Sequence, residues 1–119
     1  MKSKKKGDII YTIFTIVEER KKTKKKGSNT SFLFNKGINK IAQKVSEETA
    51  ETIIEAIQGN KKLAVQESCD LIYHLIVMWS KLGIDPNEIW NELDKRMKKS
   101  KIKRKKIRHT IIIIFSQKF

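Results

Sequence analysis

Apolar residues recur three and four positions apart along most of the chain, a spacing that predicts amphipathic helices. Before residue 97 no stretch alternates convincingly with a period of two, so we expect no strand there. The predicted helices cover residues 8–22, 38–57, 62–82 and a segment from Pro86, with a short helical turn over residues 31–35. Short connections between them favour antiparallel neighbours. The expected fold is therefore all-α, an antiparallel bundle of four main helices.

The third of these helices is apolar almost all round over residues 71–79, which is more than a four-helix monomer of this size can cover. The surplus predicts a homodimer about a two-fold axis. On the second helix, Ile38, Ile41 and Ile53 are expected on the core side. Cys69 is expected to be a small buried residue, and a single cysteine excludes an intramolecular disulfide and fits a reducing cytosol.

The 119 residues suffice for one domain, and their charge is uneven, with 27 basic against 13 acidic residues. Nine of the basic residues and no acid lie in residues 97–119. We therefore expect a helical domain over residues 1–96 and a poorly ordered basic tail over residues 97–119, with a β-prone cluster at residues 111–115. No signal peptide is visible, and no apolar stretch approaches the ~20 residues that span a bilayer. These features predict a cytoplasmic protein with no membrane partner.

One acid-x-x-acid pair, Glu48 with Glu51, precedes Gly59-Asn60, and a second, Glu67 with Asp70, follows it. Residues three apart share a helix face, so each pair is expected to act together. Four converging carboxylates repel one another unless a cation lies between them, and oxygen ligands suit Mg²⁺ or Mn²⁺. A single such pair is more often solvated, but the apolar run after Asp70 weakens that reading for the second pair. The proposed metal ligands are Glu48, Glu51, Glu67 and Asp70.

Several segments resemble the phosphoribosyl-ATP pyrophosphatases of histidine biosynthesis, a family of the all-α nucleotide pyrophosphatase superfamily. The similar residues are Arg20, Gly27-Ser28-Asn29-Thr30, Leu33-Phe34-Asn35-Lys36-Gly37, the run from Lys40 to Glu51, and Asp70-Leu71-Ile72-Tyr73-His74-Leu75. The paired acids mark only the superfamily, whereas the Ser-x-Thr turn, the Lys-Gly and the Gln-Lys-Val point to this family. Ser46 stands where the family usually has glycine, and Asn29 where an aromatic residue is usual.

The resemblance implies an enzyme that hydrolyses 1-(5-phosphoribosyl)-ATP to 1-(5-phosphoribosyl)-AMP and pyrophosphate. Glu48, Glu51, Glu67 and Asp70 match the family's metal-binding acids, with Mg²⁺ as the expected cofactor and Mn²⁺ as a substitute. Glu47 or Glu48 is the candidate base for the attacking water.

The expected substrate contacts are Arg20, Lys40 and Lys44 as phosphate clamps and Ser28 and Thr30 as hydroxyl or main-chain donors. For the two lysines of the helix, pairing with Glu47, Glu48 or Glu51 is the alternative, and both interpretations can hold together. His74 either donates to a metal-bound carboxylate or is a satisfied core histidine.

The sequence leaves two rival functions open. The first is a housecleaning pyrophosphatase for free or damaged (deoxy)nucleoside triphosphates, with the same metal site and a different base pocket. The second is a basic helical protein that binds nucleic acid through residues 97–119. The second is disfavoured because no aromatic stacking platform or reader motif accompanies the tail, and no nucleic-acid partner is expected. The Lys24-Lys25-Lys26 run is taken as solvated.

Overall fold

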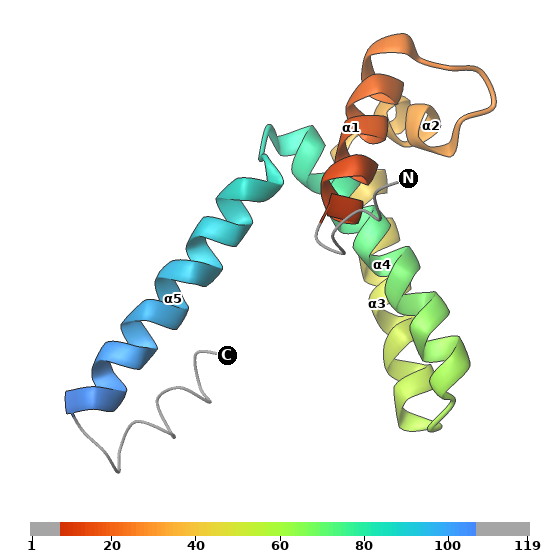
Figure 1. Cartoon of the computed structure of the whole chain (residues 1–119). Coiled ribbons are helices and arrows are strands. Elements are labelled where there is room, and N and C mark those ends of the chain that lie inside the picture. The colour runs from red at the N-terminus through yellow and green to blue at the C-terminus, as the bar shows by residue number, and fades with distance from the viewer. Residues whose placement is uncertain (1–7, 107–119) are drawn as a thin grey trace, which may run out of the picture. The chain divides into compact units, whose positions relative to one another are not determined.

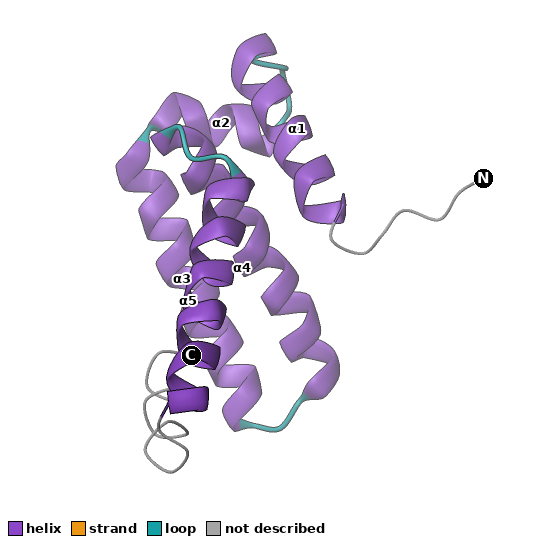
Figure 2. Cartoon of the chain, turned by 60° about the vertical axis from the view of Figure 1, so that its left-hand side comes forward, coloured by secondary structure: helices purple, strands orange, loops and turns teal. Residues whose placement is uncertain are grey.

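The computed structural model describes residues 8–106, which form helices joined by short connections, with no strand anywhere in that range. The helices are α1 (Asp8–Thr23), α2 (Asn29–Lys36), α3 (Ile38–Ile57), α4 (Lys61–Leu82) and α5 (Pro86–Lys106) (Figures 1 and 2). The predicted all-α class is confirmed, and the short turn expected near residue 31 is the complete helix α2. The β-prone cluster at 111–115 lies outside the described residues.

The chain divides into two compact units after Pro86. The first unit holds α1 to α4. The second contains α5, a continuous helix with the i,i+4 ion pairs Arg96–Glu92 at 3.2 Å and Lys98–Asp94 at 2.9 Å. α5 runs past residue 97 as far as Lys106, and the domain boundary expected there stays a prediction. None of the described helices is both long and apolar enough to cross a bilayer.

The turn between α3 and α4 sets the two long helices antiparallel and side by side (Figure 1). Gly59 adopts φ +72°, a left-handed conformation that glycine takes without steric cost. The amide of Asn60 donates to the carbonyl of Glu55 at 3.0 Å, and its side-chain oxygen accepts from the amide of Leu63 at 3.2 Å, which caps α4. The acids on the two helices therefore face one another across one hairpin.

The core draws on all four helices of the first unit, with Val17, Leu33, Ile41, Ile76 and Val77 fully buried. Ile41 lies early in α3 and Ile76 late in α4, so the core sits at the end of the hairpin that α1 and α2 cover.

Near the turn the hairpin is less covered, and two expectations are wrong there. Ile53 is 51% exposed instead of on the core side, and Cys69 is exposed instead of buried. Ile38, at the start of α3, was also expected on the core side and is 39% exposed.

Polar contacts fasten α1 and α2 to α4. Lys21 Nζ donates to the main-chain oxygen of Ser80 at 2.9 Å, and the buried Ser80 hydroxyl donates to Glu18 at 2.8 Å. The hydroxyls of Thr30 and Tyr73 share a short hydrogen bond between α2 and α4. These contacts hold the connection between α1 and α2 against the C-terminal part of α4.

Candidate metal centre and phosphate-binding residues

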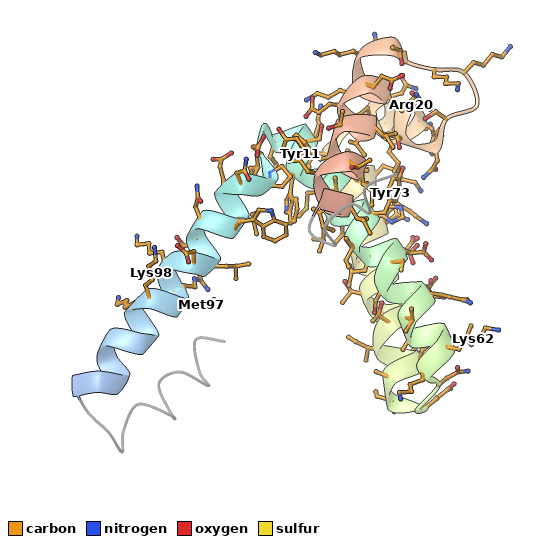
Figure 3. The ribbon with its side chains drawn as sticks, viewed as in Figure 1. Tyr11, Arg20, Lys62, Tyr73, Met97 and Lys98 are labelled. Atoms are coloured by element: carbon orange, nitrogen blue, oxygen red, sulfur yellow. The ribbon has the colours of Figure 1, made fainter. Side chains whose placement is uncertain are left out.

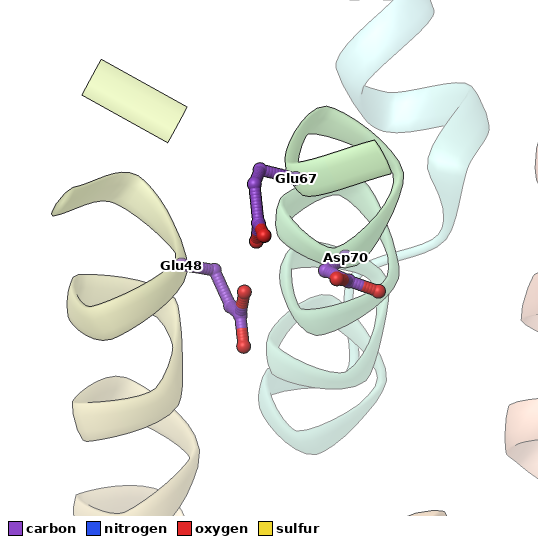
Figure 4. A group of neighbouring side chains, drawn as sticks. All are labelled: Glu48, Glu67 and Asp70. Atoms are coloured by element: carbon purple, nitrogen blue, oxygen red, sulfur yellow. The ribbon is translucent and has the colours of Figure 1, made fainter. Parts of the chain in front are cut away.

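Three carboxylates from the two long helices converge midway along the hairpin. Glu48 of α3 and Glu67 and Asp70 of α4 each bring one oxygen to within 4.8 Å of the others. Figure 4 shows the Glu48 and Glu67 side chains reaching into the space between the helices, with Asp70 beside them. The structure thus brings together one member of the first predicted pair and both members of the second.

Two of these carboxylates each have one buried oxygen without a hydrogen-bond partner among the described residues. Glu48 is only 7% exposed, and its Oε2, like the Oε2 of Glu67, is buried without a partner among the described residues. Burial, followed by the charge of Glu51, raises the pKa of Glu48. The pKa of Glu67 is raised to about 7. The largest cause is a hydrogen bond that protonated Glu67 shares with Glu51, followed by burial and by the charges of Glu51 and Asp70.

Glu51, the remaining predicted ligand, is exposed and lies one turn after Glu48 on α3. Its oxygens are outside the group of three, but it is the neighbour that most affects the pKa of Glu67. Glu51 is therefore close enough to add its charge to the cluster.

The four acids fit a small divalent cation. Buried carboxylate oxygens without donors are costly, and a cation would compensate both the missing hydrogen bonds and the mutual repulsion. A donor set of oxygens alone suits Mg²⁺ or Mn²⁺ and not a metal that prefers sulfur or imidazole.

Glu47 lies outside the group of three and is bound by side chains of its own helix. It accepts a hydrogen bond from Gln43 at 2.8 Å and one from Lys44 at 3.1 Å, and these two contacts lower its pKa. Lys44 also lies 3.8 Å from Glu48, and its hydrogen bond to Glu47 raises its own pKa. Lys44 therefore has the helix-pairing contacts that the sequence left open and lies at the edge of the acid cluster.

His74 is 6% exposed beside the cluster. Its Nδ1 lies 2.7 Å from the main-chain oxygen of Asp70, and its Nε2 has no partner among the residues described. A carbonyl only accepts, so Nδ1 carries the hydrogen, and Nε2 can donate only in the imidazolium form. His74 lies close enough to Glu48 for its charge to oppose, in small part, the rise in the pKa of Glu48.

The remaining predicted substrate contacts are spread over α1, α2 and α3. Arg20 pairs with Glu19 at 3.0 Å, and the Ser28 hydroxyl caps α2 by accepting from the amide of Ser31. Thr30 is buried and its hydroxyl is shared with Tyr73, so only its main-chain amide remains for an anion. Lys40 is partly buried in the first turn of α3.

The structure contains a basic pocket beside α1 and α2 that the sequence did not predict. Lys24, Lys25 and Lys26, taken as solvated, line a cavity of about 560 Å³ together with Arg20, Ser28 and Lys81 of α4. The run of lysines next to the Ser-x-Thr turn was the available signal. The contribution of Lys81 arises only from tertiary packing.

Comparisons with known proteins point to one family. Residues 10–97 match the family model of phosphoribosyl-ATP pyrophosphohydrolase. A phosphoribosyl-ATP pyrophosphatase of Azospirillum brasilense is 41% identical over 84% of this chain and 90% of its own length. Those of Clostridium novyi (strain NT) and Gluconobacter oxydans (strain 621H) are each 42% identical, over 77% and 74% of this chain and 84% and 66% of their own lengths.

Proposed function

Since this chain belongs to the phosphoribosyl-ATP pyrophosphohydrolase family, we propose that it hydrolyses 1-(5-phosphoribosyl)-ATP to 1-(5-phosphoribosyl)-AMP and pyrophosphate. This reaction is the second step of histidine biosynthesis. The observation that carries the proposal is the convergence of Glu48, Glu67 and Asp70 within 4.8 Å, with buried carboxylate oxygens that lack donors. Such a cluster suits a reaction on a phosphate anhydride, which in proteins commonly uses Mg²⁺.

Glu48, Glu51, Glu67 and Asp70 are the residues that would hold Mg²⁺. When bound, the ion neutralises charge on the phosphate oxygens and on the pyrophosphate leaving group. The protein contributes a preformed set of anionic oxygens on two rigid helices, so little reorganisation is needed when substrate arrives.

Glu47 is the proposed base for the attacking water. It lies outside the group of three, and the hydrogen bonds from Gln43 and Lys44 keep it ionised at neutral pH because they lower its pKa. Glu48, the other candidate, has a raised pKa and is needed for the cation. An ionised carboxylate next to the cluster can take one proton from water as the phosphorus–oxygen bond forms.

The cations and donors of α1 to α3 are the proposed substrate contacts. Lys40 and Lys44 lie on the same helix as Glu48, and Lys44 is 3.8 Å from it, so both are suited to the triphosphate. Arg20, the Ser28 hydroxyl and the main-chain amide of Thr30 offer donors near the start of α2, where a helix favours anions.

We also propose that the bundle is completed by a second copy. Large apolar side chains remain exposed on the hairpin, among them Ile54, Ile57 and Val65 at 51%, 81% and 63%. Patches of this kind are covered in stable proteins, and self-association is the simplest cover. Sedimentation of the full chain tests this, and a monomer with full activity would contradict it.

The function is tested by pyrophosphate release from phosphoribosyl-ATP, ATP and the four deoxynucleoside triphosphates, each with Mg²⁺ and with EDTA. We expect phosphoribosyl-ATP to give the highest kcat/KM and EDTA to abolish turnover. A preference for any deoxynucleotide would instead identify a housecleaning pyrophosphatase.

A further inference from the structure

The cavity between α1, α2 and the end of α4 is strongly cationic. Six basic side chains line its volume of about 560 Å³, and none of the described lining residues is acidic: Arg20, Lys21, Lys24, Lys25, Lys26 and Lys81. Cations gathered in a concave site focus positive potential and attract an anion. The pocket therefore favours a negatively charged ligand.

Most of these cations are uncommitted within the protein. Lys21 is held by the main-chain oxygen of Ser80 and lies 5.7 Å from the ring centre of Phe34. By contrast, no described carboxylate forms an ion pair with Lys24, Lys25, Lys26 or Lys81. These four side chains are exposed, so an anion in the pocket would gain their charge without breaking an ion pair.

The pocket also contains uncharged groups suited to a sugar phosphate. The Ser28 hydroxyl lines it and only accepts from the Ser31 amide, so its hydrogen is available to a ligand, whereas the Ser31 hydroxyl donates to the main-chain oxygen of Arg20 at 3.0 Å. The Phe32 side chain at the wall of the pocket is half exposed. Hydroxyls donate to phosphate and sugar oxygens, and an aromatic face packs against a ribose or a base. The lining therefore matches a ligand that carries both a phosphate and a ring.

The distance between the pocket and the acid cluster indicates which part of the substrate the pocket would bind. Asp70 and Lys81 lie on the same helix and are separated by about 16 Å along its axis at the usual helical rise. Phosphoribosyl-ATP carries a triphosphate on one ribose and a monophosphate on a second ribose, with the adenine ring between them. Two phosphate sites at a separation of this order are what an extended molecule of that kind requires.

We propose that this pocket binds the 5′-phosphate of the second ribose, the phosphate that is not cleaved, and so distinguishes phosphoribosyl-ATP from ordinary nucleoside triphosphates. The inference rests on the function proposed above and adds the group that confers specificity. The acid cluster acts on the triphosphate, and the pocket recognises the opposite end of the same molecule.

The test compares binding of two nucleotides that differ only in the phosphoribosyl group. Dissociation constants are measured by calorimetry for 1-(5-phosphoribosyl)-AMP, AMP and pyrophosphate, none of which the enzyme hydrolyses. The pocket variants are the double substitution Lys25→Gln with Lys26→Gln, and the single substitution Lys81→Gln on a different helix.

The matched control is Lys61→Gln with Lys62→Gln, which removes the same charge at the other end of α4. Arg20 at the pocket and Lys62 lie at opposite ends of the first unit (Figure 3). Helical ellipticity and melting temperature are recorded for every variant, so that a folding defect is recognised.

We expect the pocket variants to weaken 1-(5-phosphoribosyl)-AMP about tenfold or more, since each loses a charge-assisted phosphate contact. AMP and pyrophosphate should change less than about twofold, and the control should bind all three ligands as the wild type does. An equal loss for AMP, a loss specific to pyrophosphate, or no loss at all in a folded variant would overturn the inference. Failure of the wild type to hydrolyse phosphoribosyl-ATP would instead overturn the proposed function.

Discussion

The Nδ1 of His74 lies 2.7 Å from the main-chain oxygen of Asp70, one turn earlier on α4. This contact fixes the ring and leaves the buried Nε2 unpartnered among the described residues, next to Glu48. Only a protonated Nε2 could donate to a metal-binding carboxylate such as Glu48, and loss of such a donor commonly costs about ten- to hundredfold in metal affinity.

His74→Asn should therefore weaken Mg²⁺ binding by about tenfold, because asparagine reproduces the Nδ1 contact and loses Nε2. His74→Gln, which places a nitrogen or oxygen near the Nε2 position, should retain more of the affinity. Calorimetric Mg²⁺ titration separates the two. Equal, wild-type affinity in both variants would leave His74 as a core residue only.

The stability of the metal-free protein should fall as pH rises from about 4.5 to about 7. The pKa of Glu67 is raised from 4.5 to about 7 by Glu51 and by burial, so in this window the folded state binds more protons than the unfolded state. The raised pKa of Glu48 acts in the same direction. Because Mg²⁺ binds the ionised carboxylates, it should restore stability at the upper end of the window.

Melting temperature against pH in EDTA and in Mg²⁺ checks this prediction. Glu67→Gln removes the titrating group and should flatten the EDTA profile. A melting temperature that rises steadily from pH 4.5 to 7 in EDTA would contradict the assignment.

Glu51→Gln should abolish most turnover while leaving the metal-free chain as stable as the wild type or more so. The substitution removes a repulsive charge beside Glu67 and also removes a proposed Mg²⁺ ligand. Pyrophosphate release and thermal melting in EDTA measure the two effects. Glu92→Gln on α5, which loses only the exposed pair with Arg96, is the control and should change neither.

Asp70→Asn tests the same idea from α4. This substitution should likewise abolish most turnover without unfolding the chain. If it instead destabilised the fold and left Mg²⁺ affinity unchanged, Asp70 would be a structural residue and not a ligand.

Glu47→Gln should lower kcat by about a hundredfold or more with Mg²⁺ affinity retained, since Glu47 lies outside the carboxylate group and acts on water. Glu48→Gln should lower both. The comparison of kcat with metal affinity in the two variants assigns the base. If Glu47→Gln were as active as the wild type, Glu47 would serve only as a partner of Lys44.

Local chemistry was sufficient to predict the hairpin. Gly59-Asn60 breaks the helical pattern. Glu51 and Glu67 lie at similar distances from this turn, as do Glu48 and Asp70, so the acids come opposite one another once the helices are antiparallel. The all-α class followed from the same periodicity.

Features that depend on packing were not predictable. The exposure of Ile53 and Cys69 depends on where α1 and α2 end, which no local pattern encodes. The sequence left Glu47 and Glu48 as alternative bases. The structure distinguishes them, because Glu47 accepts from Gln43 and Lys44 whereas Glu48 is buried in the acid cluster. The basic pocket required Lys81 to pack beside a loop more than 50 positions away in sequence.

The central claim is that the acids of α3 and α4 form one divalent-cation site, and Mn²⁺ binding followed by electron paramagnetic resonance tests it most directly. The wild type should bind Mn²⁺ and release it on addition of Mg²⁺, and folded Glu48→Gln and Glu67→Gln variants should each lose about tenfold or more in affinity, because one ligand comes from each helix. Wild-type Mn²⁺ affinity in both folded variants would contradict the claim.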